Sequence, residues 1–203
     1  MKCIETNLVH LEIPFTTEQS AQLSRYAQQV VAGNDRVNVT GAADVEAFAA
    51  GPLFDALTLL PILKDNFSLV DIGSGGGLPA IPLAILFPQI PLTLVEPRSR
   101  RVAFLEEIRS ALQLTISIKC TQDRELPAGQ WKRAVAQAVF PPAMWMKRAK
   151  RLVGDGGVFY VLSSVPITQE MLPTRTQIDL QRRWIRPLDR AERFATRIEV
   201  NAD

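Results

Sequence analysis

The sequence predicts an α/β fold in which a mostly parallel sheet carries helices on both faces, with a helical cap before the first strand. Short apolar runs alternate with segments of helical periodicity in the C-terminal two thirds of the chain. One of these runs leads directly into a glycine-rich turn at residues 73–77. Strands that alternate with helices form parallel sheets covered on both faces.

The length and composition are those of an ordinary folded protein. The 203 residues are 47% hydrophobic and 22% charged, which suits one core domain with a small extension. We expect residues 1–64 to form an N-terminal helical extension and residues 65–203 to form the sheet domain. Because the formal net charge is only +2, a nucleic-acid surface has to come from local clusters of cations.

Several classes of protein are disfavoured. No apolar run approaches the roughly 20 residues of a membrane helix, and the first residues lack the pattern of a signal peptide. Two cysteines, Cys3 and Cys120, and one histidine, His10, have none of the usual zinc-site spacings. We therefore expect a cytoplasmic protein with no membrane contact and no metal.

The N-terminal helices come first. Apolar residues recur at helical spacing over residues 16–31, and Asp44 is a good N-cap for a second helix that extends to about residue 50. Gly51-Pro52 breaks that helix, and a third runs over residues 52–60. We expect the apolar faces of these helices to serve packing.

The stretch from Leu69 to Pro79 predicts a ligand-binding loop. Its buried strand runs into glycines, and Pro79 and Pro82 both fit the first turn of a helix that ends near residue 87. Glycine lets a ligand approach the backbone, and the amides of a helix N-terminus can point at polar groups. A flexible linker is the alternative, but the flanking strand and helix argue against it.

The next strand, residues 91–96, ends in Glu96. In nucleotide-binding βαβ units an acidic residue about 20 residues beyond the glycine loop accepts hydrogen bonds from ribose hydroxyls. Glu96 has that spacing. An exposed glutamate at a strand end is the alternative interpretation.

The remaining elements complete the alternation. A polar turn at residues 121–125 follows the third strand, at the edge of the sheet where ligands bind in open α/β folds. The periodicity predicts helices at residues 98–112 and 143–152, and further strands at 116–120, 134–138, 158–162 and 193–200.

Two cofactor classes fit the glycine loop. A dinucleotide fingerprint can be placed on residues 75–80, but its fit is ambiguous. The phrase at residues 70–77 instead resembles the motif of Rossmann-like methyltransferases that bind S-adenosylmethionine (AdoMet). Carboxylates at Asp71 and Glu96 suit a cationic ligand without a pyrophosphate.

Three stretches narrow this resemblance to the bacterial small-subunit (16S) ribosomal RNA guanine-N7 methyltransferases, the RsmG or GidB family. They are Asn38-Val39-Thr40 with residues 54–57, the phrase Gly-Leu-Pro-Ala-Ile-Pro-Leu at 77–83, and residues 93–105. The resemblance implies that Glu96 holds the ribose of AdoMet and that the backbone at Asp123 and Arg124 meets its adenine. It also implies that Arg101 lies at the edge of the cofactor site. The other residues that it assigns to the cofactor site are Asp71, Gly73, Ser74, Gly75, Gly77 and Leu78.

The chain departs from this family on the substrate side. Gly51-Pro52 stands before Asp55 where the family has Arg-His, Gln137 replaces an arginine, and Ser163 replaces a lysine. Asp55, Gln137 and Ser163 are the substrate-side candidates. Because N7 of guanine has an exposed lone pair, its methylation needs orientation rather than an acid–base residue.

The resemblance implies ribosomal RNA or the small ribosomal subunit as partner. Two alternatives stay open: a methyltransferase with another RNA or a small-molecule substrate, and a module that binds AdoMet without turnover. Cationic side chains that could contact RNA form two clusters, although each alone is more often a solvated surface. They are Lys147, Arg148, Lys150 and Arg151, and Arg182, Arg183, Arg186 and Arg190.

Overall fold

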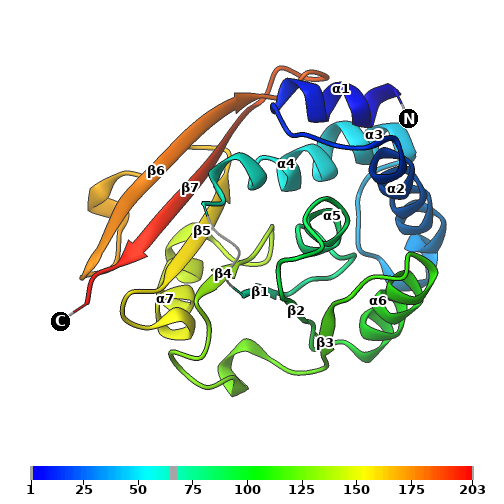
Figure 1. Cartoon of the computed structure of the whole chain (residues 1–203). Helices are drawn as coiled ribbons and strands as arrows, with labels where there is room; N and C mark the ends of the chain where they lie inside the picture. The colour runs from blue at the N-terminus through cyan, green and yellow to red at the C-terminus, as the bar shows by residue number, and fades with distance from the viewer. Residues whose placement is uncertain (1, 65–67, 203) are drawn as a thin grey trace.

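The computed structural model describes residues 2–64 and 68–202, and within them seven strands form one sheet (Figure 1). Their order is β3-β2-β1-β4-β5-β7-β6. The first five strands pair in parallel, whereas β7 is antiparallel to both of its neighbours. The strands are β1 (Leu69–Ile72), β2 (Leu92–Val95), β3 (Ser117–Lys119), β4 (Arg133–Val135), β5 (Val158–Ser163), β6 (Thr176–Ile185) and β7 (Glu192–Val200).

Helices cover both faces of this sheet, as the alternation of elements predicts. Figure 1 shows α1 to α6 on one side and α7 on the other. The helices are α1 (Lys2–His10), α2 (Thr17–Val37), α3 (Val45–Phe48), α4 (Phe54–Leu57), α5 (Ala80–Leu86), α6 (Ser99–Ala111) and α7 (Pro142–Val153). Shorter helical turns are η1 (Ala49–Leu53), η2 (Leu60–Ile62), η3 (Asp123–Glu125) and η4 (Gln169–Met171).

Each face of the sheet has its own hydrophobic core. Leu69 of β1 packs in one cluster with Leu8 and Tyr26 of the N-terminal helices, while Val70 belongs to the second cluster with Trp145 of α7. Successive residues of a strand point to opposite faces, which explains this division. The expected domain boundary between residues 64 and 65 falls at the edge of the described residues.

Two elements escaped the sequence prediction, α1 and β6. The helix α1 is short, but Ile4 and Leu8 bury it against the N-terminal bundle. The strand β6 reads as a polar segment because it is an edge strand whose side chains are mostly not buried. Both gain their structure from tertiary contacts rather than from a strong local pattern.

One apolar segment is longer than the sequence analysis expected. Among the described residues, Val45–Ile62 is long and apolar enough to cross a membrane by length and composition, with a mean hydropathy of 1.4. In the fold 67% of it is buried, and it is divided between α3, η1, α4 and η2. A buried core helix of a folded domain has the same properties.

Candidate cofactor and substrate site

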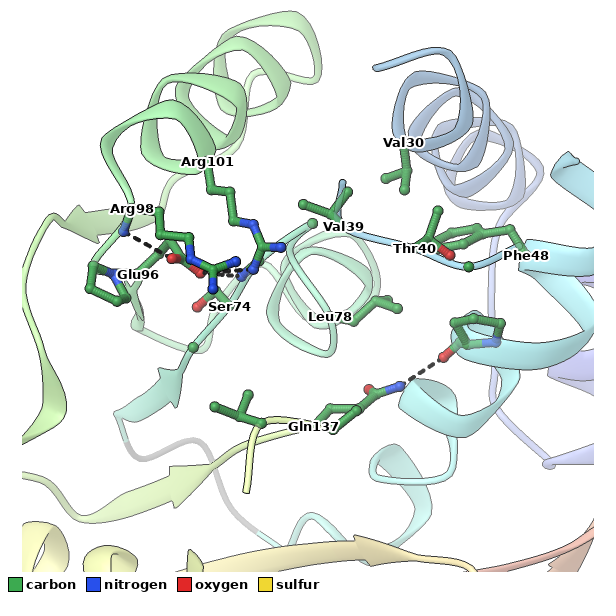
Figure 2. A pocket seen from close by; sticks show the side chains of 18 residues that line it. Val30, Val39, Thr40, Phe48, Ser74, Leu78, Glu96, Arg98, Arg101 and Gln137 are labelled. Carbon is green, nitrogen blue, oxygen red and sulfur yellow. Dashed lines mark hydrogen bonds and ion pairs between the residues drawn. The ribbon is translucent and has the colours of Figure 1, made fainter. Parts of the chain in front are cut away.

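A cavity of about 500 Å³ opens at the carboxyl ends of β1 and β2 (Figure 2). Parallel sheets of this kind bind ligands at this edge. The glycine loop forms its floor and the start of α6 one wall, while the N-terminal helical segment forms another. Its lining includes Gly73, Ser74, Gly75, Gly76, Leu78, Glu96, Arg98 and Arg101.

The glycine loop is held in one conformation. Gly77 has a φ of +100°, and a Cβ there would lie 2.3 Å from Cγ1 of Ile81, so only glycine fits. The Gly77 N–H donates to the Ser74 carbonyl oxygen at 2.6 Å, and the Tyr26 hydroxyl donates to the Gly76 carbonyl oxygen at 3.0 Å. The backbone that faces the cavity is therefore anchored from both sides of the loop.

Glu96 has a buried carboxylate that is nevertheless part of the cavity wall, with 2% of the residue exposed. Its Oε2 accepts a hydrogen bond from the Gly75 N–H at 3.1 Å, and its Oε1 accepts one from the Arg98 N–H at 2.9 Å. Each carboxylate oxygen can accept more than one hydrogen bond. Glu96 thus remains able to accept bonds from a diol.

Arg101 joins this wall to the N-terminal segment. Its Nη1 lies 4.0 Å from Oε2 of Glu96, its Nε donates to the Val37 carbonyl oxygen at 3.3 Å, and its Nη2 donates to that of Asn38. The side-chain oxygen Oδ1 of Asn34 accepts hydrogen bonds from the N–H groups of Val39 and Thr40, which follow Asn38, at 2.8 and 3.0 Å. This hydrogen bonding turns the segment after α2 over the glycine loop.

The N-terminal segment therefore supplies a wall of the site as well as packing. The expectation that its apolar faces serve only packing was incomplete. The sequence signal was the Asn38-Val39-Thr40 stretch, to which no role was assigned. The residues that sequence reasoning missed here are Val30, Val39, Thr40, Gly41, Phe48 and Pro52.

Asp71 lies behind the loop rather than in the cavity, with 1% of the residue exposed. Burial raises the pKa of its carboxyl to about 8, although the Ser74 side chain and the Ala80 N–H act to lower it. Neither oxygen has a hydrogen-bond partner of ordinary geometry within the described part of the chain. Burial also raises the pKa of Tyr26 well above its ordinary value, and Asp71 adds to that rise.

Three further residues expected at the cofactor, Gly77, Asp123 and Arg124, do not line the cavity. Gly77 shapes the loop from behind. The Asp123 carboxylate instead accepts hydrogen bonds at 2.7 Å from Arg148 of α7, and Arg151 donates to the Asp123 carbonyl oxygen at 2.6 Å. The η3 turn is thus tied to α7.

A second cavity, of about 220 Å³, adjoins the first and shares Gln137 and Ala138 with it. It brings together all three substrate-side candidates, Asp55, Gln137 and Ser163. Gln137 Nε2 donates to the Pro52 carbonyl oxygen at 2.9 Å, as Figure 2 shows, and the Ser163 hydroxyl donates to the Val165 carbonyl oxygen at 2.6 Å. The two cavities together resemble a cofactor site with an adjoining substrate entrance.

Arg193, at the start of β7, lines the second cavity, and Arg186 pairs with Asp55 in its wall. Asp55 accepts hydrogen bonds from Arg186 at 2.7 Å and from Arg193 at 3.0 Å. Sequence reasoning missed Arg193, which is 138 residues from Asp55. The positive charge that positions 137 and 163 lack is therefore partly present through other residues.

The two predicted clusters of cations are largely engaged within the protein. Arg148 and Arg151 hold the η3 turn, and Lys150 donates to the Thr174 carbonyl oxygen at 2.6 Å. Arg186 pairs with Asp55 and Asp189, and Arg183 pairs with Glu192. The part of the chain that the structure describes contains no group of three His, Cys, Asp or Glu side chains suited to a metal ion.

The sequence of this chain matches a known protein family. The sequence profile of GidB, described as rRNA small subunit methyltransferase G, matches residues 19–184. The chain belongs to this methyltransferase family. This confirms the resemblance seen in the sequence.

Curated relatives carry the same description. Ribosomal RNA small subunit methyltransferase G of Anaeromyxobacter sp. (strain Fw109-5) is 31% identical over 163 residues, which cover 78% of this chain and 76% of the relative. The protein of that name from Leuconostoc mesenteroides is 31% identical over 171 residues, or 79% of this chain and 71% of the relative. The family match therefore extends over most of both chains.

Solved structures confirm the Rossmann-like methyltransferase fold. The M. jannaschii TYW2 structure in complex with AdoMet is 14% identical, with a TM-score of 0.57 over 74% of this chain and 76% of that chain. TrmN from Thermus thermophilus is 20% identical, with a TM-score of 0.55 over 71% of this chain and 48% of that chain. These identities support the fold alone.

Proposed function

We propose that this protein transfers the methyl group of AdoMet to N7 of a guanine in 16S ribosomal RNA, in the cytoplasm. The observation that carries the proposal is that the glycine loop and Glu96, which are hydrogen-bonded to each other, line one cavity of about 500 Å³ that continues into a second cavity at Gln137. Family membership supplies the reaction type and supports ribosomal RNA as the substrate.

The residues of the cavity fit AdoMet. Glu96 is fixed by two backbone N–H groups and keeps accepting capacity for the two ribose hydroxyls. The absence of side chains at Gly73 and Gly75 lets the ligand lie against the loop backbone. A volume of about 500 Å³ lies within the range of small-molecule sites.

Methyl transfer to guanine N7 needs no acid–base side chain. AdoMet supplies an electrophilic methyl group on a sulfonium centre. Because guanine N7 already carries a lone pair, the protein has to orient the base, exclude water and keep the two reactants in line. Gln137, at the junction of the two cavities, and the loop after β4 are placed to border the base.

The substrate-side departures favour a diverged RNA or small-molecule substrate as the second candidate. Gln137 and Ser163 carry no charge, and the nearby Arg186 and Arg193 are paired with Asp55. An RNA phosphate bound there has to compete with that carboxylate. This alternative keeps the same cofactor site and changes only the acceptor.

The test is an AdoMet titration by calorimetry, followed by methyl transfer to 16S ribosomal RNA that lacks N7 methylation and to 30S particles that lack it. We expect AdoMet binding and transfer of one methyl group to a guanine. AdoMet binding without transfer to either RNA substrate would contradict the ribosomal substrate. The double variant Gln137→Arg, Ser163→Lys then discriminates, since a gain in transfer supports ribosomal RNA and no gain favours another acceptor.

A further inference from the structure

A cleft rich in arginine lies beside the cofactor cavity, outside the proposed cofactor and substrate sites. It has a volume of about 560 Å³ and is formed by the end of α2 and the junction between β2 and α6. Of its lining residues, Pro97, Arg98 and Arg101 also line the cofactor cavity. Figure 2 shows the side chains of Arg98 and Arg101 on this shared wall.

The charge in this cleft is not balanced. Four arginines line it, namely Arg36, Arg98, Arg100 and Arg101, and no acidic residue does so among the described residues. Arg36 pairs with Glu107 at 3.0 Å, and Arg101 lies 4.0 Å from Glu96. In the described part of the chain, no carboxylate lies within 4.0 Å of the guanidinium of Arg98 or Arg100.

The position of these cations makes the cluster unfavourable without an anion. Arg98 is the N-cap residue of α6 and Arg100 stands in its first turn, where the helix dipole is positive and where acidic residues stabilise a helix. The first turn of α6 contains no acidic residue, and Arg98 forms no side-chain cap. Like charges at the positive end of a helix repel one another unless a ligand neutralises them.

The walls of the cleft are rigid. The helices α2 and α6 approach so closely that a Cβ on Gly33 would lie 2.5 Å from Cε2 of Phe104. Arg101 ties the same two elements together through the carbonyl oxygens of Val37 and Asn38. The four guanidinium groups are therefore presented by a fixed frame rather than by a loop.

We propose that this cleft, lined by Arg36, Arg98, Arg100 and Arg101, binds phosphodiester groups of the substrate RNA. Guanidinium groups recognise phosphate through paired N–H donors. Because the cleft shares a wall with the cofactor cavity, a bound phosphate holds the RNA backbone close to the site of methyl transfer. This inference rests on the proposed RNA substrate and adds a contact on the α2–α6 side, away from Gln137.

The test uses Arg36→Ala, Arg100→Ala in one double variant, because neither side chain lines the cofactor cavity. The matched control is Arg25→Ala, Arg109→Ala, which removes two exposed arginines from the same helices outside the cleft. Binding to unmodified 16S ribosomal RNA is measured over a range of salt concentrations. Calorimetry measures AdoMet binding, and competition by inorganic phosphate measures free-anion binding.

We expect the cleft variant to bind this RNA at least about tenfold more weakly at low salt, with a salt slope shallower by about 1.4 to 1.8. The control should keep the wild-type slope, and AdoMet affinity should stay within about twofold in both variants. Equal slopes for cleft and control variants would overturn the proposal. The proposal would also be overturned if the wild-type protein bound no RNA. A cleft variant that lost affinity only for AdoMet or for inorganic phosphate, and not for RNA, would overturn it as well.

The outcome is separable from that of the proposed function. Methyl transfer by the wild-type protein tests the function, whereas the salt slope tests the cleft without turnover. A wild-type enzyme that methylates ribosomal RNA while the cleft variant keeps its slope refutes the cleft alone. A changed slope without any methyl transfer supports the cleft and refutes the reaction.

Discussion

Gln137 Nε2 donates a hydrogen bond to the Pro52 carbonyl oxygen at 2.9 Å, which joins the loop after β4 to the π-helical turn η1. The two residues are 85 positions apart in the chain. This bond lies where the two cavities meet, and it also fixes the orientation of the Gln137 amide. The oxygen Oε1 of that amide is buried without a hydrogen-bond partner among the described residues.

Replacing Gln137 tests this connection. Gln137→Ala leaves the Pro52 carbonyl oxygen without its donor, so we expect the free energy of unfolding to fall by about 1 to 3 kcal/mol. Urea denaturation measures the change. The exposed residue Gln28 supplies the control, since Gln28→Ala should shift stability by less than about 0.5 kcal/mol. Equal effects of the two substitutions would show that the bond contributes nothing.

Glu96 should determine the affinity for AdoMet. Glu96→Gln keeps the shape of the side chain but removes its charge and replaces one acceptor oxygen with a donor. We expect AdoMet to bind at least about tenfold more weakly, which corresponds to about 1.4 kcal/mol. Calorimetry compares this variant with Glu106→Gln, a change on α6 at a side chain that does not line the cavity. Unchanged affinity would mean that Glu96 only supports the loop.

Asp71 should make the stability of the fold depend on pH. The folded protein keeps the carboxyl proton up to a pKa of about 8, whereas the unfolded chain loses it near the ordinary value of 3.8. Between these values the folded state binds more protons, so the free energy of unfolding falls as pH rises, by at most about 1.4 kcal/mol per pH unit.

The isosteric substitution Asp71→Asn removes this contribution. We expect its stability to decline less than that of the wild type between about pH 5 and about pH 8, as measured by urea denaturation at each pH. The exposed Asp35→Asn is the control and should follow the wild-type profile. Parallel profiles for wild type and Asp71→Asn would refute the shifted titration.

Gly77→Ala should be among the most damaging single substitutions. The new Cβ would lie 2.3 Å from Cγ1 of Ile81 at a φ of +100°, which combines a steric clash with backbone strain. We expect a loss of at least about 2 kcal/mol, visible as a lower melting temperature. Gly41→Ala is the control, because a Cβ there meets no atom within 4 Å in the described structure. Similar melting temperatures for both variants would contradict the clash.

The sequence predicted best those elements that are formed by residues contiguous in the chain. The strand that ends at Ile72, the glycines that follow and Glu96 at the end of β2 are contiguous patterns, and the structure places the loop and Glu96 at one cavity. Continuous apolar runs identify parallel strands because both faces of the sheet are covered.

Contacts between distant segments could not be predicted in this way. The strand β6 has a polar pattern because it lies at the edge of the sheet. Two contacts at the site depend on packing between segments far apart in the chain. They are the ion pair between Asp55 and Arg193 and the placement of the Val39 side chain over Gly76. The ion pair between the Asp123 carboxylate and Arg148 of α7 is a further contact of this kind, and the expectation that the backbone at Asp123 and Arg124 meets the adenine stays a prediction.

The position of β7 has a consequence for synthesis of the protein. This strand is inserted between β5 and β6, both of which precede it in the chain. While the chain emerges from the ribosome, β5 therefore presents an open edge, and β6 has no strand to pair with. A chain that stops before Glu192 leaves both edges exposed, so a truncated product should aggregate even though its entire glycine loop has been made.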